Sequence, residues 1–269
     1  MSTQIKFCSL ASGSSGNCYY VGNEKHGILI DAGIGVRTIK KRLKDIGVAL
    51  ESILGIFVTH DHFDHIASIG VLGEIHHIPI FSTPEILDGI NRCYKVTQKL
   101  QHSKRPIAKN KIIEIGSFTI EAFSVSHDAS DCVGYTICQG TKKFTIATDL
   151  GYINTEAAQH LMNATSFVVE SNYDEQTLLE NPSYPTYLKE RILSNKGHLS
   201  NHALAEFLSI NYQEHWQHIF LCHLSKENNS PECALSTIDK KIAHQRFNLW
   251  ANCTLIALPR TTPTEVFII

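Results

Sequence analysis

Short apolar and alternating segments, separated by glycine, serine and asparagine, dominate the first half of the chain and recur in the second half. Runs of this kind predict β-strands joined by turns. We expect strands at residues 5–10, 17–22, 27–33, 53–60, 79–83, 118–127, 134–138, 143–149, 166–172 and 218–224. The first half therefore reads as strands with few helices.

A helical period replaces the alternation in a few places. From Val36 to Ile46, apolar side chains recur at helical spacing, and the run stops at Gly47. Ser230 is a suitable N-cap for a later helix. We expect three helices in the second half of the chain, at residues 184–195, 201–210 and 230–246. The second half thus combines strands with more helix.

No charge block, low-complexity tract or proline-rich hinge divides the 269 residues. The Gly/Ser-rich segment 11–17 is too short to link domains, so we expect a loop there. The length is ample for a single hydrophobic core. We therefore expect one domain, 1–269, built of two similar sheet halves (roughly 1–140 and 141–269) with helices outside.

Composition narrows the class of protein. A hydrophobic content of 43% and a charged content of 19% are typical of a globular chain. The net charge of −2 excludes a generally basic surface, so any nucleic-acid site must be local. No secretory signal and no membrane-length apolar run is seen, and the eight cysteines contain no C-x-x-C pair. We expect a cytoplasmic protein with reduced thiols and no membrane partner.

Metal-binding residue types crowd into the segment VTHDHFDHI, residues 58–66. The spacing at a strand end lets His60 and His62 face one ion while Asp64 and His65 reach a neighbouring one. Imidazole with carboxylate suits zinc, manganese or iron(II). A solvated loop rich in His and Asp is the alternative explanation.

Three further candidate ligands follow later strands: His127, Asp149 and His223. Each alone is more typical of an ordinary surface or core residue. Strand ends hold side chains rigidly, however, and together with the cluster near residue 60 they complete a set of seven ligands for two metals. Asp149 is the candidate bridging carboxylate.

The pattern H-x-H-x-D-H, followed in order by His, Asp and His, resembles the metallo-β-lactamase superfamily. The segments LASGSSGNCYYVG, THDHFDHI, ATDLGY, ESNYDEQTLLENPSYPTYLKERILSNKGHLSN and HLSKENNSPE resemble its YycJ/WalJ-like branch. This resemblance covers nearly the whole chain. It implies an α/β fold in four layers, an αββα sandwich of two mixed sheets with outer helices.

The resemblance also implies a division of the ligands, and the chain departs from the pattern at none of the seven positions. It assigns His60, His62 and His127 to one metal, Asp64, His65 and His223 to the other, and Asp149 to both. The cofactors are then two divalent ions, with Zn²⁺ preferred and Mn²⁺ or Fe²⁺ as alternatives. Asp31, in ILIDAG, is expected to support the histidine loop rather than to bind metal.

Two neighbouring metals favour hydrolysis of esters, amides or phosphodiesters, and the segment GHLSN (197–201) bears on the choice. Ser200 and Asn201 begin an expected helix whose N-terminus could seat a phosphate. The alternative is that Ser200 only caps the helix and His198 is solvent-exposed. A similar segment in tRNase Z-like phosphodiesterases implies that His198 binds or protonates the leaving oxygen. Asp64 is the expected proton acceptor.

The loop SGSSGN could also present donors to a phosphate, which makes Ser14 and Asn17 candidate substrate-binding residues; a tight hairpin loop is the alternative. Residues 170–174 are expected to line the same rim, with no assigned role. The resemblance implies a 5'-3' exonuclease acting on DNA. A hydrolase of a small thioester, lactone or cyclic phosphodiester and a non-catalytic regulatory metal-binding module remain alternatives.

Overall fold

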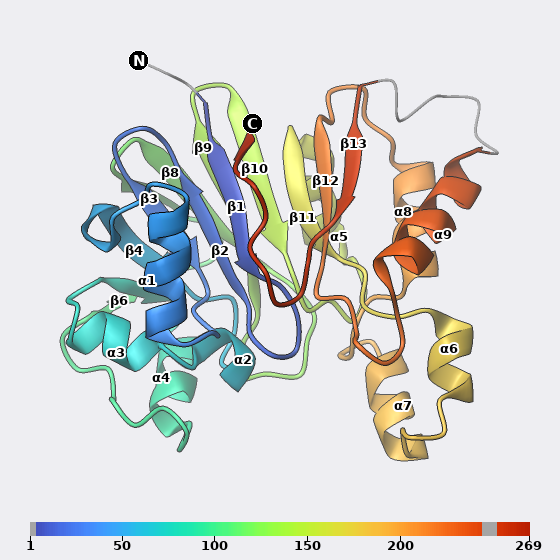
Figure 1. Cartoon of the computed structure of the whole chain (residues 1–269), viewed down its shortest axis with the longest axis horizontal. Coiled ribbons are helices and arrows are strands. Elements are labelled where there is room, and N and C mark those ends of the chain that lie inside the picture. The colour runs from blue at the N-terminus through green and yellow to red at the C-terminus, as the bar shows by residue number, and fades with distance from the viewer. Residues whose placement is uncertain (1–3, 244–251) are drawn as a thin grey trace.

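Two seven-stranded β-sheets face each other in the computed structural model, which describes residues 4–243 and 252–269 (Figure 1). The first sheet has the order β14 (Phe267–Ile268), β1 (Lys6–Ala11), β2 (Cys18–Gly22), β3 (Gly27–Ile30), β4 (Ile53–Phe57), β5 (Ile80–Ser82) and β6 (Lys104–Pro106). The second has the order β13 (Thr254–Ala257), β12 (His218–Cys222), β11 (Ser166–Glu170), β10 (Lys142–Ala147), β9 (Val133–Gln139), β8 (Phe118–Ser124) and β7 (Ile112–Ile115).

Each sheet is antiparallel along one part and parallel along the other. Strands β14, β1, β2 and β3 pair antiparallel, and β3 to β6 pair parallel. The second sheet repeats this plan, antiparallel from β7 to β10 and parallel from β10 to β13. From the sequence we expected the chain to divide into its two sheets near residue 140, but it does not. Strands β7 to β9 already belong to the second sheet, and β14 returns to the first.

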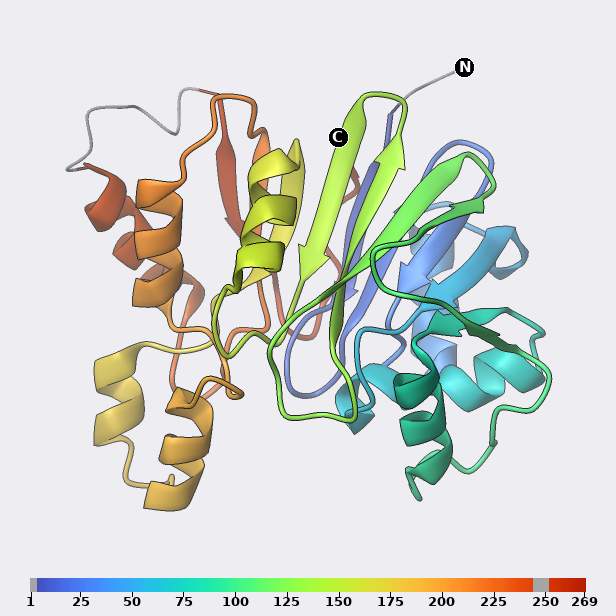
Figure 2. The same ribbon diagram turned by 180° about the vertical axis from the view of Figure 1, so that it is seen from behind.

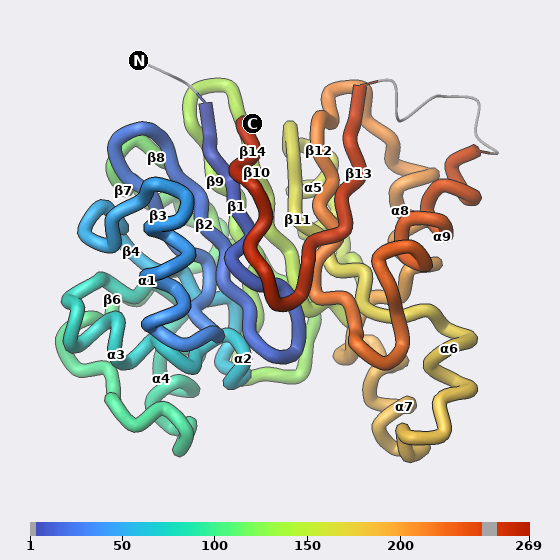
Figure 3. The backbone as a smooth tube through the Cα atoms, viewed as in Figure 1, coloured from blue at the N-terminus to red at the C-terminus, as the bar shows by residue number. Residues whose placement is uncertain are grey.

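Helices cover the outer faces. The first sheet carries α1 (Val36–Asp45), α3 (Ile69–Glu74) and α4 (Pro84–Arg92), and the second carries α5 (Thr155–Asn163), α8 (Asn201–Ile210) and α9 (Pro231–Ala243). Figure 2 shows α5 against the second sheet from behind. The short helices α2 (Phe63–Ile66), α6 (Glu175–Glu180) and α7 (Thr186–Leu193) lie near one end of the sandwich, as the tube in Figure 3 makes plain; a 3-10 turn, η1 (Leu50–Ser52), precedes β4. The predicted αββα architecture is confirmed.

Aromatic side chains join the two sheets in one core. The ring of Phe7, on β1, lies 4.8 Å from that of Phe144 on β10 and 4.7 Å from that of Phe220 on β12, measured between centroids. All three side chains are buried. Full burial of a phenylalanine side chain stabilises the folded protein by roughly 1.5–3 kcal/mol. The apolar interface between the sheets therefore stabilises the sandwich away from its polar end.

The predicted strands exist, but several end earlier than expected. His127, Asp149 and His223 lie after the last residues of β8, β10 and β12 instead of closing them. The sequence reading missed α3 to α6 and the edge strands β6, β7, β13 and β14. The helix expected at 230–246 begins at Pro231, and residues 244–246 lie outside the described residues.

Two local predictions are confirmed. Within the segment 11–17, residues 12–17 form a loop between the antiparallel strands β1 and β2, and Ala11 is the last residue of β1. The Ser230 hydroxyl accepts a hydrogen bond from the backbone N–H of Cys233 at 3.1 Å, as expected of an N-cap. No helix within residues 4–243 and 252–269 combines the length and the apolar character needed to cross a bilayer.

Candidate active site

Loops that follow strands of both sheets bring the seven predicted ligands together at one end of the sandwich. The segment after β4 supplies His60 and His62 from a loop and Asp64 and His65 from α2. The loops after β8, β10 and β12 supply His127, Asp149 and His223. Within each of the groups described next, the candidate ligand atoms lie within 4.8 Å of one another. Residues about 160 positions apart in the chain thus meet in one cluster.

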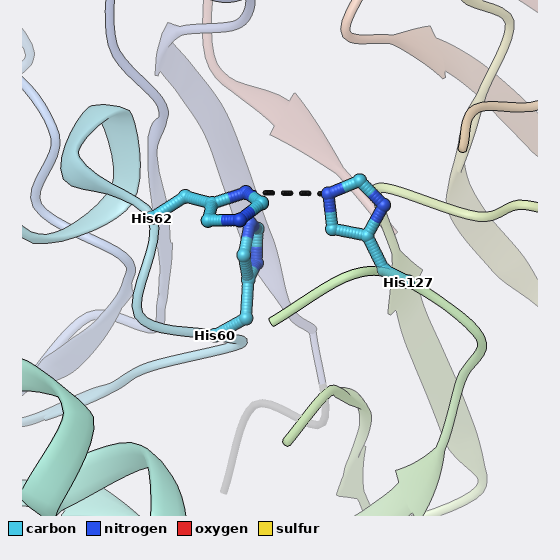
Figure 4. Close-up of side chains that lie close together, drawn as sticks. All are labelled: His60, His62 and His127. Carbon is cyan, nitrogen blue, oxygen red and sulfur yellow. Dashed lines mark hydrogen bonds between the residues drawn. The ribbon is translucent and has the colours of Figure 1, made fainter. Parts of the chain in front are cut away.

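The first group consists of His60, His62 and His127 (Figure 4). His127 Nε2 lies 3.3 Å from His62 Nδ1. The centroid of the His60 ring is 4.7 Å from that of His62 and 5.1 Å from that of His127. The three rings converge from two sheets, so one cation could contact a nitrogen of each.

The second group consists of Asp64, His65 and His223. Asp64 Oδ2 lies 3.7 Å from His65 Nε2 and 3.6 Å from His223 Nε2. Asp149 stands between the groups. Its Oδ2 is 3.3 Å from His65 Nε2, and its Oδ1 is 3.8 Å from His127 Nε2. This carboxylate can therefore reach both groups, as a bridging ligand must.

The hydrogen bonds of the histidine rings fix which nitrogen faces the cluster. In each ring one nitrogen meets a protein acceptor: His60 Nδ1 meets Thr59 Oγ1 (3.0 Å), His62 Nε2 meets the Asp128 carbonyl (3.2 Å), His65 Nδ1 meets Asp31 Oδ2 (2.7 Å), His127 Nδ1 meets the Gly197 carbonyl (2.8 Å), and His223 Nδ1 meets Glu170 Oε1 (3.0 Å). In the neutral form of each ring, which is the form that binds a metal, the other nitrogen then carries a lone pair directed at the cluster. Among the described residues, the buried Nε2 atoms of His60 and His223 have no hydrogen-bond partner. A metal ion fits this donor set.

Asp31 supports the histidine loop, in agreement with the role expected from the sequence. Its carboxylate accepts hydrogen bonds from the Thr59 N–H (2.8 Å), the Thr59 hydroxyl (2.8 Å) and His65 Nδ1 (2.7 Å). The side chain is fully buried, and burial raises the pKa of Asp31 although the nearby His65 and these hydrogen bonds act in the opposite direction. Asp31 thus orients one candidate ligand, His65, without belonging to either ligand group.

Glu170 opens the segment 170–174, which the sequence led us to expect at the rim of the site without an assigned role. It is fully buried at the end of β11. Its Oε1 accepts from His198 Nδ1 at 2.7 Å and from His223 Nδ1 at 3.0 Å, while Oε2 accepts the backbone N–H groups of Leu150 (2.7 Å) and Leu199 (3.0 Å). Burial alone would raise the pKa of Glu170, but the charge and hydrogen bond of His198 and the hydrogen bond of His223 lower it. The position of Glu170 at the end of β11 is the feature that points to a role in the site, because β11 lies between β10 and β12, and these strands lead to Asp149 and His223.

Three of these residues adopt a backbone conformation that is uncommon for non-glycine residues. The φ angles of Asp31, Asp149 and His223 are 60°, 56° and 53°. The left-handed conformation interrupts the extended chain and turns each side chain out of the strand direction. This accounts for the ends of β10 and β12 before Asp149 and His223, contrary to the prediction that the ligands close the strands; β8 ends before His127 without such a residue.

Charge in the cluster is strongly perturbed. Burial alone would raise the pKa of Asp149, but His223 and His65 hold it well below its ordinary value. Burial alone would lower the pKa of His65, but Asp31 and Asp149 hold it well above its ordinary value. Burial, reinforced by His65, lowers the pKa of His60 well below its ordinary value. Such buried carboxylates require positive charge close by.

His198 lies at the edge of the cluster. Its side chain is 19% exposed, and its ring centroid is 5.0 Å from that of His127 and 5.3 Å from that of His223. Since Nδ1 is held by Glu170, Nε2 is the nitrogen left to contact a substrate. The alternative of a solvent-exposed His198 does not hold.

The other predicted substrate-binding residues of this segment have partners within the protein. The Ser200 hydroxyl caps α8 by accepting the Ala203 N–H at 3.1 Å. The Asn201 N–H donates to the Tyr173 carbonyl at 2.9 Å, and the Asn201 side chain is buried. Capping and burial thus give their polar groups partners within the protein, and their role as substrate-binding residues stays a prediction.

The loop after β1 gives a mixed outcome. Asn17 is fully buried, and its amide nitrogen lies 2.9 Å from His65 Nε2 and 3.4 Å from Asp64 Oδ2. It therefore lies against two of the candidate ligands from a buried position, and its role as a substrate-binding residue stays a prediction. Ser14 is exposed, and its role as a substrate-binding residue stays a prediction. Ser12 of the same loop accepts the backbone N–H of His223 at 3.0 Å.

The chain is similar to known proteins over most of its length. A family model described as "Beta-lactamase superfamily domain" matches residues 26–211. Exodeoxyribonuclease WalJ of Streptococcus pneumoniae is 36% identical over 240 residues, which are 89% of this chain and 88% of that protein. Exodeoxyribonuclease YycJ of Bacillus anthracis is 30% identical over 245 residues, which are 91% of this chain and 92% of that protein.

Solved structures share the fold. The metallo-β-lactamase fold protein YhfI from Bacillus subtilis has a TM-score of 0.70 with 15% identity, covering 99% of this chain and 100% of that one. Zn²⁺-bound PqqB from Methylobacterium extorquens has a TM-score of 0.71 with 13% identity, covering 97% and 99%. At this level of identity the likeness concerns the architecture alone.

Proposed function

Because the chain belongs to the metallo-β-lactamase superfamily, within the group of the WalJ and YycJ exodeoxyribonucleases, we propose that it is a metal-dependent exonuclease that hydrolyses phosphodiester bonds of DNA. The observation that carries the proposal is the convergence of two ligand groups on the shared carboxylate of Asp149. The alternative functions, a thioester or lactone hydrolase and a non-catalytic metal-binding module, are not favoured, since the relatives that match nearly the whole chain are named as nucleases.

The charges of the site support two cations. Asp31, Asp64, Asp149 and Glu170 place four carboxylates in or directly behind the cluster, and three of them are nearly or fully buried. Two divalent cations would neutralise these four charges. A donor set of imidazole and carboxylate suits Zn²⁺ first, with Mn²⁺ and Fe²⁺ as alternatives.

The cations, when bound, supply Lewis-acid stabilisation of a phosphate and a water that ionises near neutral pH. The protein supplies the groups that move protons. The Asp64 side chain is 26% exposed, so its carboxylate reaches the opening and can accept a proton from the attacking water. His198 Nε2, held in place through Nδ1 by Glu170, can bind or protonate the leaving oxygen.

The test is degradation of end-labelled DNA by the purified, metal-loaded protein. Oligonucleotides labelled at the 5' end or the 3' end, single-stranded or duplex, report the direction of digestion, which we propose to be 5' to 3'. We expect His62→Ala to abolish digestion and His198→Ala to reduce kcat by about 10²- to 10⁴-fold, the range of general acid catalysis. Intact DNA after incubation with wild-type protein carrying its full metal complement would refute the proposal.

A small-molecule assay distinguishes the proposed exonuclease from a thioester or lactone hydrolase. Hydrolysis of a thioester or a lactone needs no group that protonates a phosphodiester's leaving oxygen. Measurable thioester or lactone hydrolysis that survives His198→Ala, with no digestion of DNA, would favour that alternative.

A further inference from the structure

An arginine and an aspartate without a part in the chemistry proposed above form an ion pair at the edge of the first ligand group. Arg191, on α7, donates from Nε to Asp128 Oδ2 at 2.5 Å. Asp128 directly follows His127 in the chain, and its backbone carbonyl accepts from His62 Nε2 at 3.2 Å. The pair therefore joins α7 to two members of the first ligand group.

The other oxygen of the Asp128 carboxylate faces the ligands. Oδ1 lies 3.5 Å from His127 Nε2, the nitrogen that faces the cluster, and 3.8 Å from His62 Nε2. This Oδ1 atom is buried and has no hydrogen-bond partner among the residues that the structure describes. One carboxylate thus reaches from the ligand group to the guanidinium, and only its width and one contact separate Arg191 Nε from His127.

The backbone that carries Arg191 is held against the same ligand. Gly197 packs so closely on the carbonyls of Arg191 and Ile192 that an added Cβ would overlap both. The Gly197 carbonyl in turn accepts from His127 Nδ1 at 2.8 Å, and the His198 N–H donates to the Ile192 carbonyl at 3.0 Å. In Figure 1, α7 lies at the same end of the sandwich as α2. The fold therefore fixes the place of Arg191 before any ligand arrives.

The guanidinium of Arg191 keeps two donor groups available. Within residues 4–243 and 252–269, Nε is the one nitrogen of this side chain that has a hydrogen-bond partner, and the side chain is 52% exposed. The planar pair of Nη1 and Nη2 matches two oxygens of a phosphate. Because the chain has a net charge of −2, attraction of a polyanion depends on local cations of this kind.

We propose that Arg191 binds the phosphate next to the one that is cleaved, and that Asp128 positions its guanidinium for this contact. The bound cations engage the scissile phosphate, whereas Arg191 stands beyond the Asp128 carboxylate, where the next phosphate of the strand passes. This inference rests on the proposed function and deepens it, because it makes a backbone phosphate outside the metal cluster part of substrate recognition.

The experiment uses DNA in which one phosphodiester is replaced by an uncharged methylphosphonate, moved stepwise away from the scissile linkage; a 5'-hydroxyl end is the neutral counterpart of a terminal phosphate. On unmodified DNA we expect Arg191→Gln to raise KM about 10- to 100-fold, as for the loss of a charged hydrogen bond, with kcat changed much less. With the neutral group at the contacted position, wild-type protein should show the same rise, and Arg191→Gln should lose nothing more. Arg105→Gln, a matched change at an exposed arginine of β6 that donates to backbone carbonyls, should keep wild-type kinetics throughout.

Asp128 has its own pair of variants. Asp128→Asn retains an oxygen that can accept from Arg191 Nε, whereas Asp128→Ala has none. We expect Asp128→Ala to raise KM as much as Arg191→Gln does, Asp128→Asn to stay near the wild-type value, and the double variant of Asp128→Ala and Arg191→Gln to be no worse than either alone. A wild-type KM in Asp128→Ala would overturn the positioning role.

Metal affinity separates substrate binding from a purely structural ion pair. Since Arg191 reaches the ligands only through Asp128, Arg191→Gln should bind Zn²⁺ with wild-type affinity in competition with a chromophoric chelator. A pair that merely fixes the loop after β8 would give weaker Zn²⁺ binding in Arg191→Gln and an equal loss of activity on charged and neutral linkages. That pattern would overturn the proposal.

The two hypotheses fail differently. If wild-type protein degrades DNA and Arg191→Gln has the wild-type KM, or loses the same factor on every methylphosphonate substrate, Arg191 binds no phosphate but the exonuclease proposal stands. If wild-type protein loaded with metal leaves every DNA substrate intact, the proposed function itself fails. Thermal unfolding of each variant verifies that the fold is retained.

Discussion

Replacing Glu170 by glutamine tests how this buried carboxylate controls the ligands. In the wild type, Oε2 accepts two backbone N–H groups and Oε1 accepts the Nδ1–H groups of His198 and His223. A glutamine has only one oxygen. If that oxygen serves the two backbone donors, the amide N–H₂ must face the histidines, whose Nδ1 atoms then have to accept.

An accepting Nδ1 carries no proton, so the neutral His223 ring must carry its proton on Nε2. That nitrogen is the one that lies 3.6 Å from Asp64 Oδ2 and completes the second ligand group. A protonated Nε2 cannot bind a metal. The opposite orientation of the amide instead leaves two buried backbone N–H groups facing an N–H₂ group. Loss of such a supporting partner lowers metal affinity or activity by about 10- to 100-fold.

The assay is competition for Zn²⁺ against a chromophoric chelator, which reports the affinity of each ion separately. We expect Glu170→Gln to weaken the binding of one ion by about 10- to 100-fold and to leave the other, held by His60, His62 and His127, much less affected. Glu180→Gln on α6 is the matched control, since Glu180 is exposed and accepts only from a neighbouring Gln176 amide. Wild-type affinity for both ions in Glu170→Gln would refute the reasoning.

Three further predictions concern stability. Gly197→Ala should lower the free energy of unfolding by about 1–3 kcal/mol, because an added Cβ would lie 2.1 Å from a backbone carbonyl oxygen; Gly35→Ala, where the nearest atom is 4.0 Å away, is the control in thermal unfolding. Burial would raise the pKa of Glu74, but hydrogen bonds from residues 101–103 lower it to about 2. The ionised Glu74 should therefore stabilise the fold by about 1 kcal/mol. This stabilisation should be complete above pH 4.5 and disappear as the pH falls towards 2. In urea unfolding, the stabilities of Glu74→Gln and wild type should therefore converge at low pH. At a metal concentration of 100 times Kd, a bound metal stabilises the folded protein by about 2.7 kcal/mol. Removal of the metal by a chelator should therefore lower Tm by roughly 5–10 °C. An unchanged Tm would contradict the proposed site.

The sequence carried enough information to predict the layers of the fold and the strands that border the site. Alternation and flanking turn residues mark strands such as β2 and β10 directly. The edge strands were missed because they are short, with only three residues in β6 and two in β14, and pair only through tertiary contacts. Helices α3 and α4 were missed because glycines interrupt their apolar periodicity.

For the site, local patterning pointed to the residues that form the cluster, and the supporting role of Asp31 was expected, but the supporting contacts of Asn17 and Glu170 were not. The spacing around His60 and the strand-end position of Asp149 are visible in the sequence. Whether Asn17 faces solvent or His65 depends on the close packing of the loop after β1 against residues 64 and 65, which no local pattern encodes. Glu170 was expected only as part of the rim segment 170–174, and its role could not be predicted for the same reason, since its partners lie 20 to 53 residues away in the chain.

The distribution of the ligands between the sheets argues that the ions serve chemistry more than folding. Each group takes two ligands from the loop after β4 of the first sheet and one from the second sheet, so each ion would tie the sheets together. The sheets do not need this tie, because an apolar core around Phe7, Phe144 and Phe220 already joins them. Structural zinc sites are closed, whereas here Asp64 and His198 remain 26% and 19% exposed. A site that concentrates buried carboxylates at a cost to stability, yet opens on one side, is organised to receive a substrate.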